Sequence, residues 1–189
     1  MTALTDNALM LRVKAGDLDP MSLLFERYHR PLLGFLFRMT GQRDVSEDLV
    51  QNVFYRMLKY RHTFTGKGEF RAWMYQMARN ALADHAKQIR RAGYPKDVAD
   101  VAEKLAGGPE ADAALAQAQE LDALQEALNA LPDEYREVLV LSRFQELKYE
   151  EIARVLQTTE GAVKVRVHRA LNKLRSLFLE IENGKAHNL

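Results

Sequence analysis

Apolar residues recur at intervals of three and four positions along most of the chain, which is the spacing of amphipathic helices. A first run of this kind surrounds Leu9, and a second extends to about residue 39. Gly16 and the pair Asp19-Pro20 separate the two runs, and Gly41 ends the second, because glycine and proline interrupt helices. The N-terminal part of the sequence therefore predicts two successive helices.

Two further helices are predicted before residue 95. One covers Val45–Lys59 and the other Phe70–Arg91, and the polar residues 60–69 form a loop between them. Gly93 and Pro95 end the second of these helices and, with it, the first domain. The residues expected to cap the start of the Val45–Lys59 helix are Asp44 with Glu47, or Ser46 alone.

The second half of the chain is also predicted to be helical. Residues 95–115 read as a linker because Gly107-Gly108-Pro109 is accompanied by few large apolar residues. An alanine-rich helix is expected from about 110 to 130, another begins near Asp133, and the last two cover about 149–156 and 160–178. We therefore predict an all-α fold with helical domains at residues 1–94 and 116–189, joined by a flexible acidic linker at 95–115.

Charge is distributed unevenly, although the net charge of the chain is +1. Residues 20–94 carry 13 Lys and Arg against 6 Asp and Glu, residues 95–137 carry 3 against 11, and residues 138–178 carry 8 against 4. Two basic blocks around an acidic one suggest two surfaces for a polyanion and a connector that avoids it. A solvated charge pattern with no partner explains the composition equally well.

Several classes of protein are disfavoured by what the sequence lacks. The absence of cysteine rules out disulfides and thiolate metal sites. We find no signal-peptide pattern and no window apolar enough to cross a membrane, so we expect a cytoplasmic protein. The five histidines form no catalytic or metal-binding motif, and no Gly-rich phosphate loop occurs. We therefore predict that the chain is not an enzyme and has no metal, cofactor or small-molecule substrate.

The most specific local pattern is a helix-turn-helix at residues 149–171. Apolar stripes on the two helices face each other, Ala153 provides a small side chain where they cross, and Thr159 is placed to cap the second helix. The outer face of the second helix is basic, as in a recognition helix that enters the major groove. The alternative is a helical hairpin with a solvated basic face. Two roles stay open: Val165 faces either bases or the core, and His168 either touches DNA or packs.

A second basic face lies on the predicted Phe70–Arg91 helix. Its members share a sector of roughly 100° on the helix: Gln76, Arg79, Asn80, Ala83, Lys87 and Arg90. Such a stripe suits a phosphate backbone, and the preceding loop contains groups able to hold an unstacked base. A solvated face is the alternative. The aromatic residues here, including Phe64 and Trp73, are at a spacing more typical of a core.

Taken together, these blocks resemble the extracytoplasmic-function (ECF) sigma factors of the bacterial sigma-70 family, over about residues 9–177. Three blocks occur in the family's order and spacing, which makes the resemblance specific. Phe25-Glu26-Arg27-Tyr28 and residues 48–54 are similar to the first conserved region, residues 73–80 with Asp84 and Arg90-Arg91 to the −10 region, and Leu131-Pro132, Arg136, Glu151-Ile152-Ala153 and residues 161–170 to the −35 region.

The resemblance implies a partner for each surface. The Val45–Lys59 helix, which spacing alone leaves open between a docking face and ordinary surface, would bind the β′ clamp helices of core RNA polymerase through Asp48, Gln51, Asn52 and Arg56, and the β flap would be a second polymerase contact. The −10 element of promoter DNA would bind His62, Phe64, Lys67, Gln76, Arg79, Asn80, Lys87, Arg90 and Arg91. The −35 element would bind Thr159, Glu160, Lys164, Arg166, His168, Arg169 and Lys173. The acidic linker would run through the polymerase towards the RNA exit path, and an anti-sigma factor would control the protein.

Two departures from the family pattern limit these implications. Ala162 and Val165 stand where family members often have Thr and Ser, so two hydroxyl groups near the DNA are lost and the −35 sequence is not predicted. The alternative function is a stand-alone helix-turn-helix transcription regulator, which would leave the first domain without a role.

Overall fold

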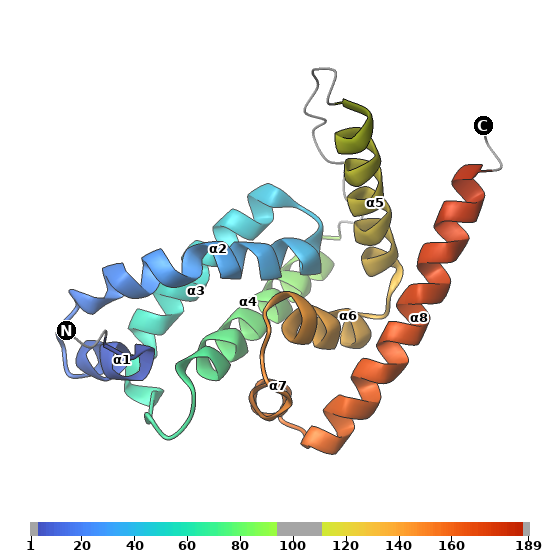
Figure 1. The fold of residues 1–189 in the computed structure, drawn as a ribbon. Helices are drawn as coiled ribbons and strands as arrows, with labels where there is room; N and C mark the ends of the chain where they lie inside the picture. Colours follow the sequence, from blue (N-terminus) through green and yellow to red (C-terminus); the bar gives the residue numbers. More distant parts are fainter. Residues whose placement is uncertain (1–3, 94–110, 187–189) are drawn as a thin grey trace.

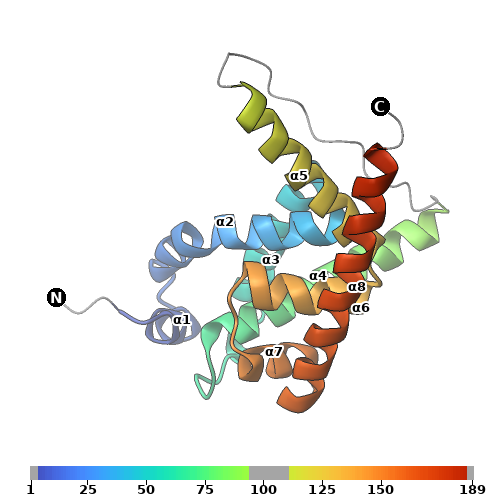
Figure 2. The ribbon, with the colours of Figure 1, turned by 45° about the vertical axis from the view of Figure 1, so that its right-hand side comes forward.

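The computed structural model describes residues 4–93 and 111–186, and it gives side-chain surroundings for residues 4–93 and 121–184. Within these ranges the chain is helical and contains no strand, which confirms the predicted all-α class. Figures 1 and 2 show an N-terminal domain of helices α1–α4 packed against a C-terminal domain of helices α5–α8. Residues 95–110, most of the predicted linker, lie outside the described residues.

The N-terminal domain follows the predicted order of helices. It consists of α1 (Asp6–Lys14), α2 (Pro20–Thr40), α3 (Arg43–Lys59), a short 3-10 turn (Arg61–Thr63) and α4 (Phe70–Ala92). The predicted break at Gly41 is confirmed, because this residue ends α2 with a left-handed φ of 71° and donates its N–H to the Phe37 carbonyl at 2.7 Å. A glycine adopts this conformation without the steric cost that a Cβ imposes.

The predicted cap of α3 was wrong. This helix begins two residues earlier than expected, Gln42 is its N-cap, and no side chain caps it. Ser46 is instead fully buried inside the helix, where its hydroxyl donates to the Gln42 carbonyl at 2.5 Å and lies 2.9 Å from the Thr40 hydroxyl. Ser46 therefore fixes the α2–α3 corner through side-chain bonds to backbone, a role that serine can take within a helix.

The C-terminal domain contains α5 (Ala111–Ala130), α6 (Asp133–Leu139), a π-helical segment (Val140–Phe144), α7 (Tyr149–Leu156) and α8 (Glu160–Ala186). The bounds of α7 match the prediction, and α8 extends eight residues beyond its predicted end at 178. Helix α5 begins at Ala111, so residues 111–115 of the expected linker are helical.

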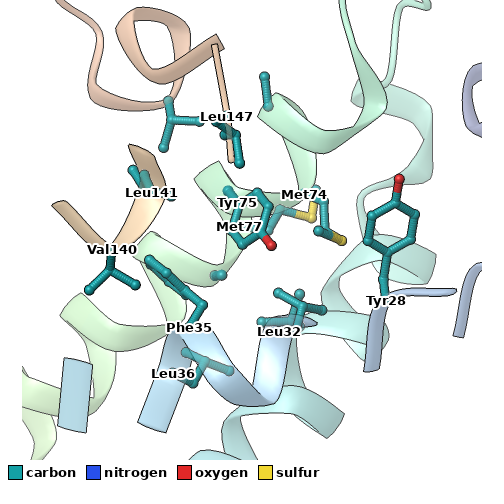
Figure 3. Close-up of a cluster of buried hydrophobic side chains, with 14 of the residues drawn as sticks. Tyr28, Leu32, Phe35, Leu36, Met74, Tyr75, Met77, Val140, Leu141 and Leu147 are labelled. Carbon is teal, nitrogen blue, oxygen red and sulfur yellow. The ribbon is translucent and has the colours of Figure 1, made fainter. Parts of the chain in front are cut away.

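One continuous hydrophobic core joins the two domains. Figure 3 shows Phe35 and Leu36 of α2 and Tyr75 and Met77 of α4 beside Val140, Leu141 and Leu147 of the C-terminal domain. Helix α4 also contacts α7, and α2 contacts α5 and α6. Since apolar burial is the main favourable term in such a contact, the π-helical segment and the loop after it hold the domains together with the help of these helices.

Candidate nucleic-acid interface

The helix-turn-helix has the packing that its sequence predicts. Ile152, Ala153 and Leu156 of α7 are buried, as are the apolar residues that face them from α8, with Leu171 partly buried. Gln157 provides the turn by adopting a left-handed φ of 53°. The predicted cap is confirmed, because the Thr159 hydroxyl accepts the N–H of Ala162 at 3.2 Å. The cap satisfies one of the free donors at the helix start and fixes where α8 begins.

The start of α7 is fixed by a contact that the sequence reasoning missed. The Lys148 backbone N–H donates to the Glu151 carboxylate at 2.8 Å, and Glu151 is only 6% exposed. This is the backward half of a capping box, and the signal for it was a glutamate three residues after the N-cap. It orients α7, and through α7 the recognition helix.

The outer face of α8 is open to solvent. Of the residues predicted to contact the −35 element, Arg166 is half-buried and the others are exposed: Thr159, Glu160, Lys164, His168, Arg169 and Lys173. Val165 is 50% exposed, so it faces outward on this surface. His168 lies 3.2 Å from the Asn172 amide nitrogen. Within residues 121–184, Lys164, Arg169 and Lys173 form no ion pair, which leaves their charges available to phosphates.

The basic face of α4 is only partly open. Asn80, Lys87, Arg90 and Arg91 are exposed, as are His62 and Lys67 in the preceding loop. Lys87 lies 3.9 Å from Asp84, at the limit of an ion pair. Gln76 and Arg79, nearer the start of α4, are half-buried, and Arg79 is paired with Glu137 of the C-terminal domain. The structure thus leaves the C-terminal members of the predicted −10 surface exposed and the other two partly exposed.

Phe64 is placed differently from the other predicted −10 residues. Its ring is 3% exposed and packs edge-on against Phe70 and Trp73, at centroid distances of 6.2 and 5.2 Å. A ring enclosed in this way has no face free for a base, so Phe64 is a core residue of this arrangement. The same aromatic cluster holds the loop against α4.

Helix α1 braces that loop, a role that the sequence did not indicate. The Asn7 side chain donates to the Gly68 carbonyl at 2.8 Å and accepts the Phe70 N–H at 2.7 Å. Lys14 donates to the Phe64 carbonyl at 2.6 Å. These bonds join α1 to residues 50 or more positions away and set the conformation of the loop before α4. Hydrogen bonds between residues so distant in sequence cannot be predicted from the spacing of residues within one helix.

The outer face of α3 carries the predicted polymerase contacts. Asp48, Gln51 and Asn52 are exposed, and Arg56 is half-buried. The Arg56 guanidinium donates to the Asn52 side-chain oxygen at 2.6 Å and to the Asp84 carboxylate at 2.9 Å. Arg56 thus links α3 to α4 as well as lying on this surface.

Polar side chains cross the contact between the domains. The Tyr75 hydroxyl donates to the Gln145 side-chain oxygen at 2.6 Å, and Arg71 donates to the Gln145 carbonyl. Arg79 pairs with Glu137 at 2.9 Å. Burial raises the pKa of Glu137, and the attraction of Arg79 offsets this only in part. A residue predicted to bind DNA is therefore held by a carboxylate of the other domain.

Arg136, which belongs to the family pattern, binds backbone carbonyls and has a structural role. Its guanidinium donates to the carbonyls of Leu128, Asn129 and Leu131 at the end of α5, and to the Met39 carbonyl of α2 at 3.0 Å. Burial lowers its pKa, while Asp133 raises it. Arg136 satisfies carbonyls that the end of a helix leaves free, and it connects both domains.

The part of the chain that the structure describes contains neither a candidate metal site nor a candidate membrane span. No group of three or more His, Cys, Asp or Glu side chains is placed to hold a metal ion. No helix there is long and apolar enough to span a membrane.

Comparison with known proteins identifies both domains. The family model for sigma-70 region 2 matches residues 24–92, and the model for sigma-70 region 4 matches residues 121–174. The chain is 30% identical to the RNA polymerase sigma-H factor of Pseudomonas aeruginosa, over 90% of this chain and 92% of that protein. It is also 30% identical to the ECF RNA polymerase sigma factor SigW of Bacillus subtilis, over 90% and 95%.

Solved structures agree with this match. A sigma factor RpoE of Bartonella quintana, in complex with the anti-sigma factor NepR, is 25% identical to the chain with a TM-score of 0.66, covering 82% of this chain and 94% of that one. CnrH, in complex with the cytosolic domain of CnrY, shares the fold with a TM-score of 0.70 at 23% identity, over 91% and 96%. A stand-alone helix-turn-helix regulator would leave the region 2 match unexplained. The chain therefore belongs to the sigma-70 family, among its extracytoplasmic-function sigma factors.

Proposed function

We propose that this sigma factor directs promoter-specific transcription initiation by binding core RNA polymerase through α3 and promoter DNA through two separate basic surfaces. The observation that carries the proposal is that one chain combines an exposed basic face on region 2 with a helix-turn-helix whose outer Lys and Arg are open to solvent. The chain has no catalytic role of its own, because the polymerase performs the chemistry. It acts in the cytoplasm, where polymerase and chromosome meet.

Each surface has a separate partner. Asp48, Gln51, Asn52 and Arg56 contact the β′ clamp helices, and region 4 contacts the β flap. The −10 element binds the open part of the α4 surface and its loop: His62, Lys67, Asn80, Lys87, Arg90 and Arg91. The −35 element binds Thr159, Glu160, Lys164, Arg166, His168, Arg169 and Lys173. Phosphate contacts fix the position of the protein, while contacts to base edges select the sequence.

The DNA-bound form has its two domains apart. The Arg79 guanidinium donates to Glu137 of region 4 at 2.9 Å, so part of its donor capacity is held by a carboxylate and is not offered to a phosphate. Separation of the domains releases Arg79 from Glu137 and makes its whole guanidinium available to the −10 element. We call the arrangement in Figure 1 the closed arrangement, in which regions 2 and 4 share one core.

An anti-sigma factor is the proposed regulator. The RpoE structure that is 25% identical to this chain was solved with such an inhibitor bound. A protein that binds across regions 2 and 4 would favour the closed arrangement by binding it more tightly than the open one. Binding of the inhibitor would therefore preserve the pair between Arg79 of region 2 and Glu137 of region 4.

The test combines purified chain with core RNA polymerase on a library of genomic fragments, and the RNA 5′ ends are sequenced. Unaltered chain should bind polymerase and give a defined set of start sites. The double variant Lys164→Gln/Arg166→Gln should lose about tenfold or more of this output, because two Arg or Lys contacts to DNA are removed. The matched control Arg12→Gln/Arg43→Gln removes the same charge at two exposed residues, each paired with a nearby carboxylate, and should leave the output unchanged.

Two results would contradict the proposal. If the purified chain, freed of any inhibitor, does not bind core polymerase, the proposed function is wrong. Tight, sequence-specific binding to duplex DNA without polymerase would instead favour a stand-alone regulator.

A further inference from the structure

A cavity of about 590 Å³ lies between the two domains. Its walls come from α2, from α4 and from residues 144–146, which comprise the last residue of the π-helical segment of region 4 and the two residues after it. Four arginines line it, Arg27, Arg30, Arg38 and Arg71, against a single carboxylate, that of Glu146. None of these arginines belongs to the surfaces assigned above to polymerase or promoter DNA.

The positive charge of the cavity is only partly compensated. Arg27 pairs with Asp6 at 2.6 Å, and Arg71 donates to the Gln145 carbonyl. Arg38 donates to the Gly34 carbonyl at 3.0 Å and lies 4.2 Å from the centre of the Phe144 ring, so its contacts are neutral. Within residues 4–93 and 121–184, neither Arg30 nor Arg38 forms an ion pair. Burial lowers the pKa of Arg38, as expected for a cation without an anionic neighbour.

Helix α2 places two of these arginines and a glycine on the side that faces the cavity. Arg27, Gly34 and Arg38 recur at intervals of seven and four along one side of the helix, over a length of about 16 Å. A Cβ at Gly34 would lie 3.2 Å from an Arg38 guanidinium nitrogen, closer than an ordinary contact. The glycine therefore leaves room for the Arg38 side chain to lie back along the helix towards the cavity.

We infer that this cavity binds a small molecule with two or more phosphate groups, of the pyrophosphate or nucleoside diphosphate class. Guanidinium groups match phosphate geometry with paired hydrogen bonds, and their rigid donor fork makes arginine the preferred residue for such anions. The volume is in the range of small-molecule sites. A ligand with several negative charges would offset the repulsion among the cations that lack an anionic partner, such as Arg30 and Arg38, which water screens less well in a partly enclosed site.

Binding at this position acts on the arrangement of the domains. Region 4 supplies Phe144, Gln145 and Glu146 to the wall, so the cavity is complete only when the domains are packed together. A ligand that binds the closed arrangement better than the open one shifts the population towards the closed one. This consequence for transcription rests on the proposed function, whereas the binding itself does not.

Isothermal titration of the full chain with sodium pyrophosphate, and separately with ADP, tests the inference. Ionic strength is held constant with chloride, and the Lys164→Gln/Arg166→Gln background removes binding to the recognition helix. One molecule should bind per chain. Arg38→Gln and, separately, Arg30→Gln should each weaken binding about tenfold or more, since a charge-assisted contact is lost. Arg43→Gln, the same change outside the cavity, should bind like the unaltered chain.

Arg30→Gln keeps the test valid if Arg38→Gln does not fold, because Arg30 is exposed. The inference is overturned if neither phosphate compound binds, if Arg43→Gln weakens binding as much as Arg30→Gln, or if an acidic peptide binds in an Arg30-dependent way while both phosphate compounds do not. As a second readout, pyrophosphate should weaken polymerase binding by the unaltered chain and not by Arg38→Gln. A chain that binds pyrophosphate at this site but never binds polymerase would refute the proposed function alone.

Discussion

Replacing Tyr75 with phenylalanine removes one hydroxyl group from the contact between regions 2 and 4. The ring is 1% exposed and stacks edge-on with Phe35 at 5.3 Å, and these contacts within region 2 remain. What disappears is the hydrogen bond of 2.6 Å to the Gln145 side-chain oxygen, which is itself buried. Since Gln145 belongs to region 4, the loss falls mainly on the closed arrangement, and the open one exposes both groups to water.

The size of the effect on the equilibrium between open and closed protein follows from the Gln145 side-chain oxygen, which loses its donor. A buried polar group without its partner costs about 1–3 kcal/mol, and a value of about 1.5 kcal/mol changes an equilibrium roughly tenfold. Tyr75→Phe should therefore raise the ratio of open to closed protein about tenfold. Removing both partners should restore much of the closed population, because apolar replacement of both groups is nearly neutral. The double variant Tyr75→Phe/Gln145→Met should thus be more closed than either single variant.

Single-molecule energy transfer measures this ratio directly. The chain has no native cysteine, so Asp44→Cys on α3 and Arg175→Cys on α8 allow a dye to be placed on each domain at an exposed position. Tyr55→Phe serves as the control, because it removes the same hydroxyl group from a residue that is 61% exposed on α3. An unchanged open population in Tyr75→Phe, or a double variant that is more open than both single variants, would refute the reasoning.

Three further predictions concern other contacts. The pKa of Glu137 is raised in the folded protein, so the folded chain binds more protons than the unfolded one, and the contribution of Glu137 to stability is lost as pH rises above about 4.5. Glu137→Gln should remove this part of the pH dependence and be at least as stable at pH 7, as measured by urea unfolding at several pH values. An unchanged dependence of the unfolding free energy on pH would contradict this. Thr159→Ala should lower the unfolding free energy by about 1 kcal/mol through loss of the helix cap, whereas Thr159→Ser should not; equal melting temperatures of the two would refute the cap. Asn7→Ala should speed amide hydrogen exchange at residues 64–70 by about tenfold or more, since two bonds that hold the loop are lost; unchanged exchange would mean that α1 does not brace it.

The sequence was informative where a feature depends on neighbours along the chain. Gly41 and Gly93 ended α2 and α4 close to the predicted places, and apolar spacing identified the helices of both domains. Thr159 was recognised as a cap because the cap and the N–H it accepts lie three residues apart. The cap of α3 was misjudged because Asp44, Ser46 and Glu47 all carry suitable oxygens. Of these three residues, Ser46 is the one that is buried at the α2–α3 corner, and this depends on how the two helices pack.

The candidate site divides in the same way. Lys164, Arg169 and Asn80 were found from helical periodicity, since the outer face of an amphipathic helix can be counted from its apolar face. The resemblance to sigma factors implied a DNA contact for Phe64, although its spacing was more typical of a core, and the packing of its ring against Phe70 and Trp73 places it in the core. The hydrogen bonds from Asn7 to the loop before α4 could not be predicted, because an asparagine in the first turn of a helix is common and indicates no particular partner.

The sequence by itself determined the helices, the two domains, the helix-turn-helix and the sigma-factor family, because each depends on local spacing or on motifs in a fixed order. The tertiary structure alone decided how the domains meet. The pairs Arg79–Glu137, Tyr75–Gln145 and Arg136–Met39 join residues 58, 70 and 97 positions apart. Such contacts form only when apolar faces of separate domains pack together, and periodicity within one helix carries no information about which partner its buried face will find.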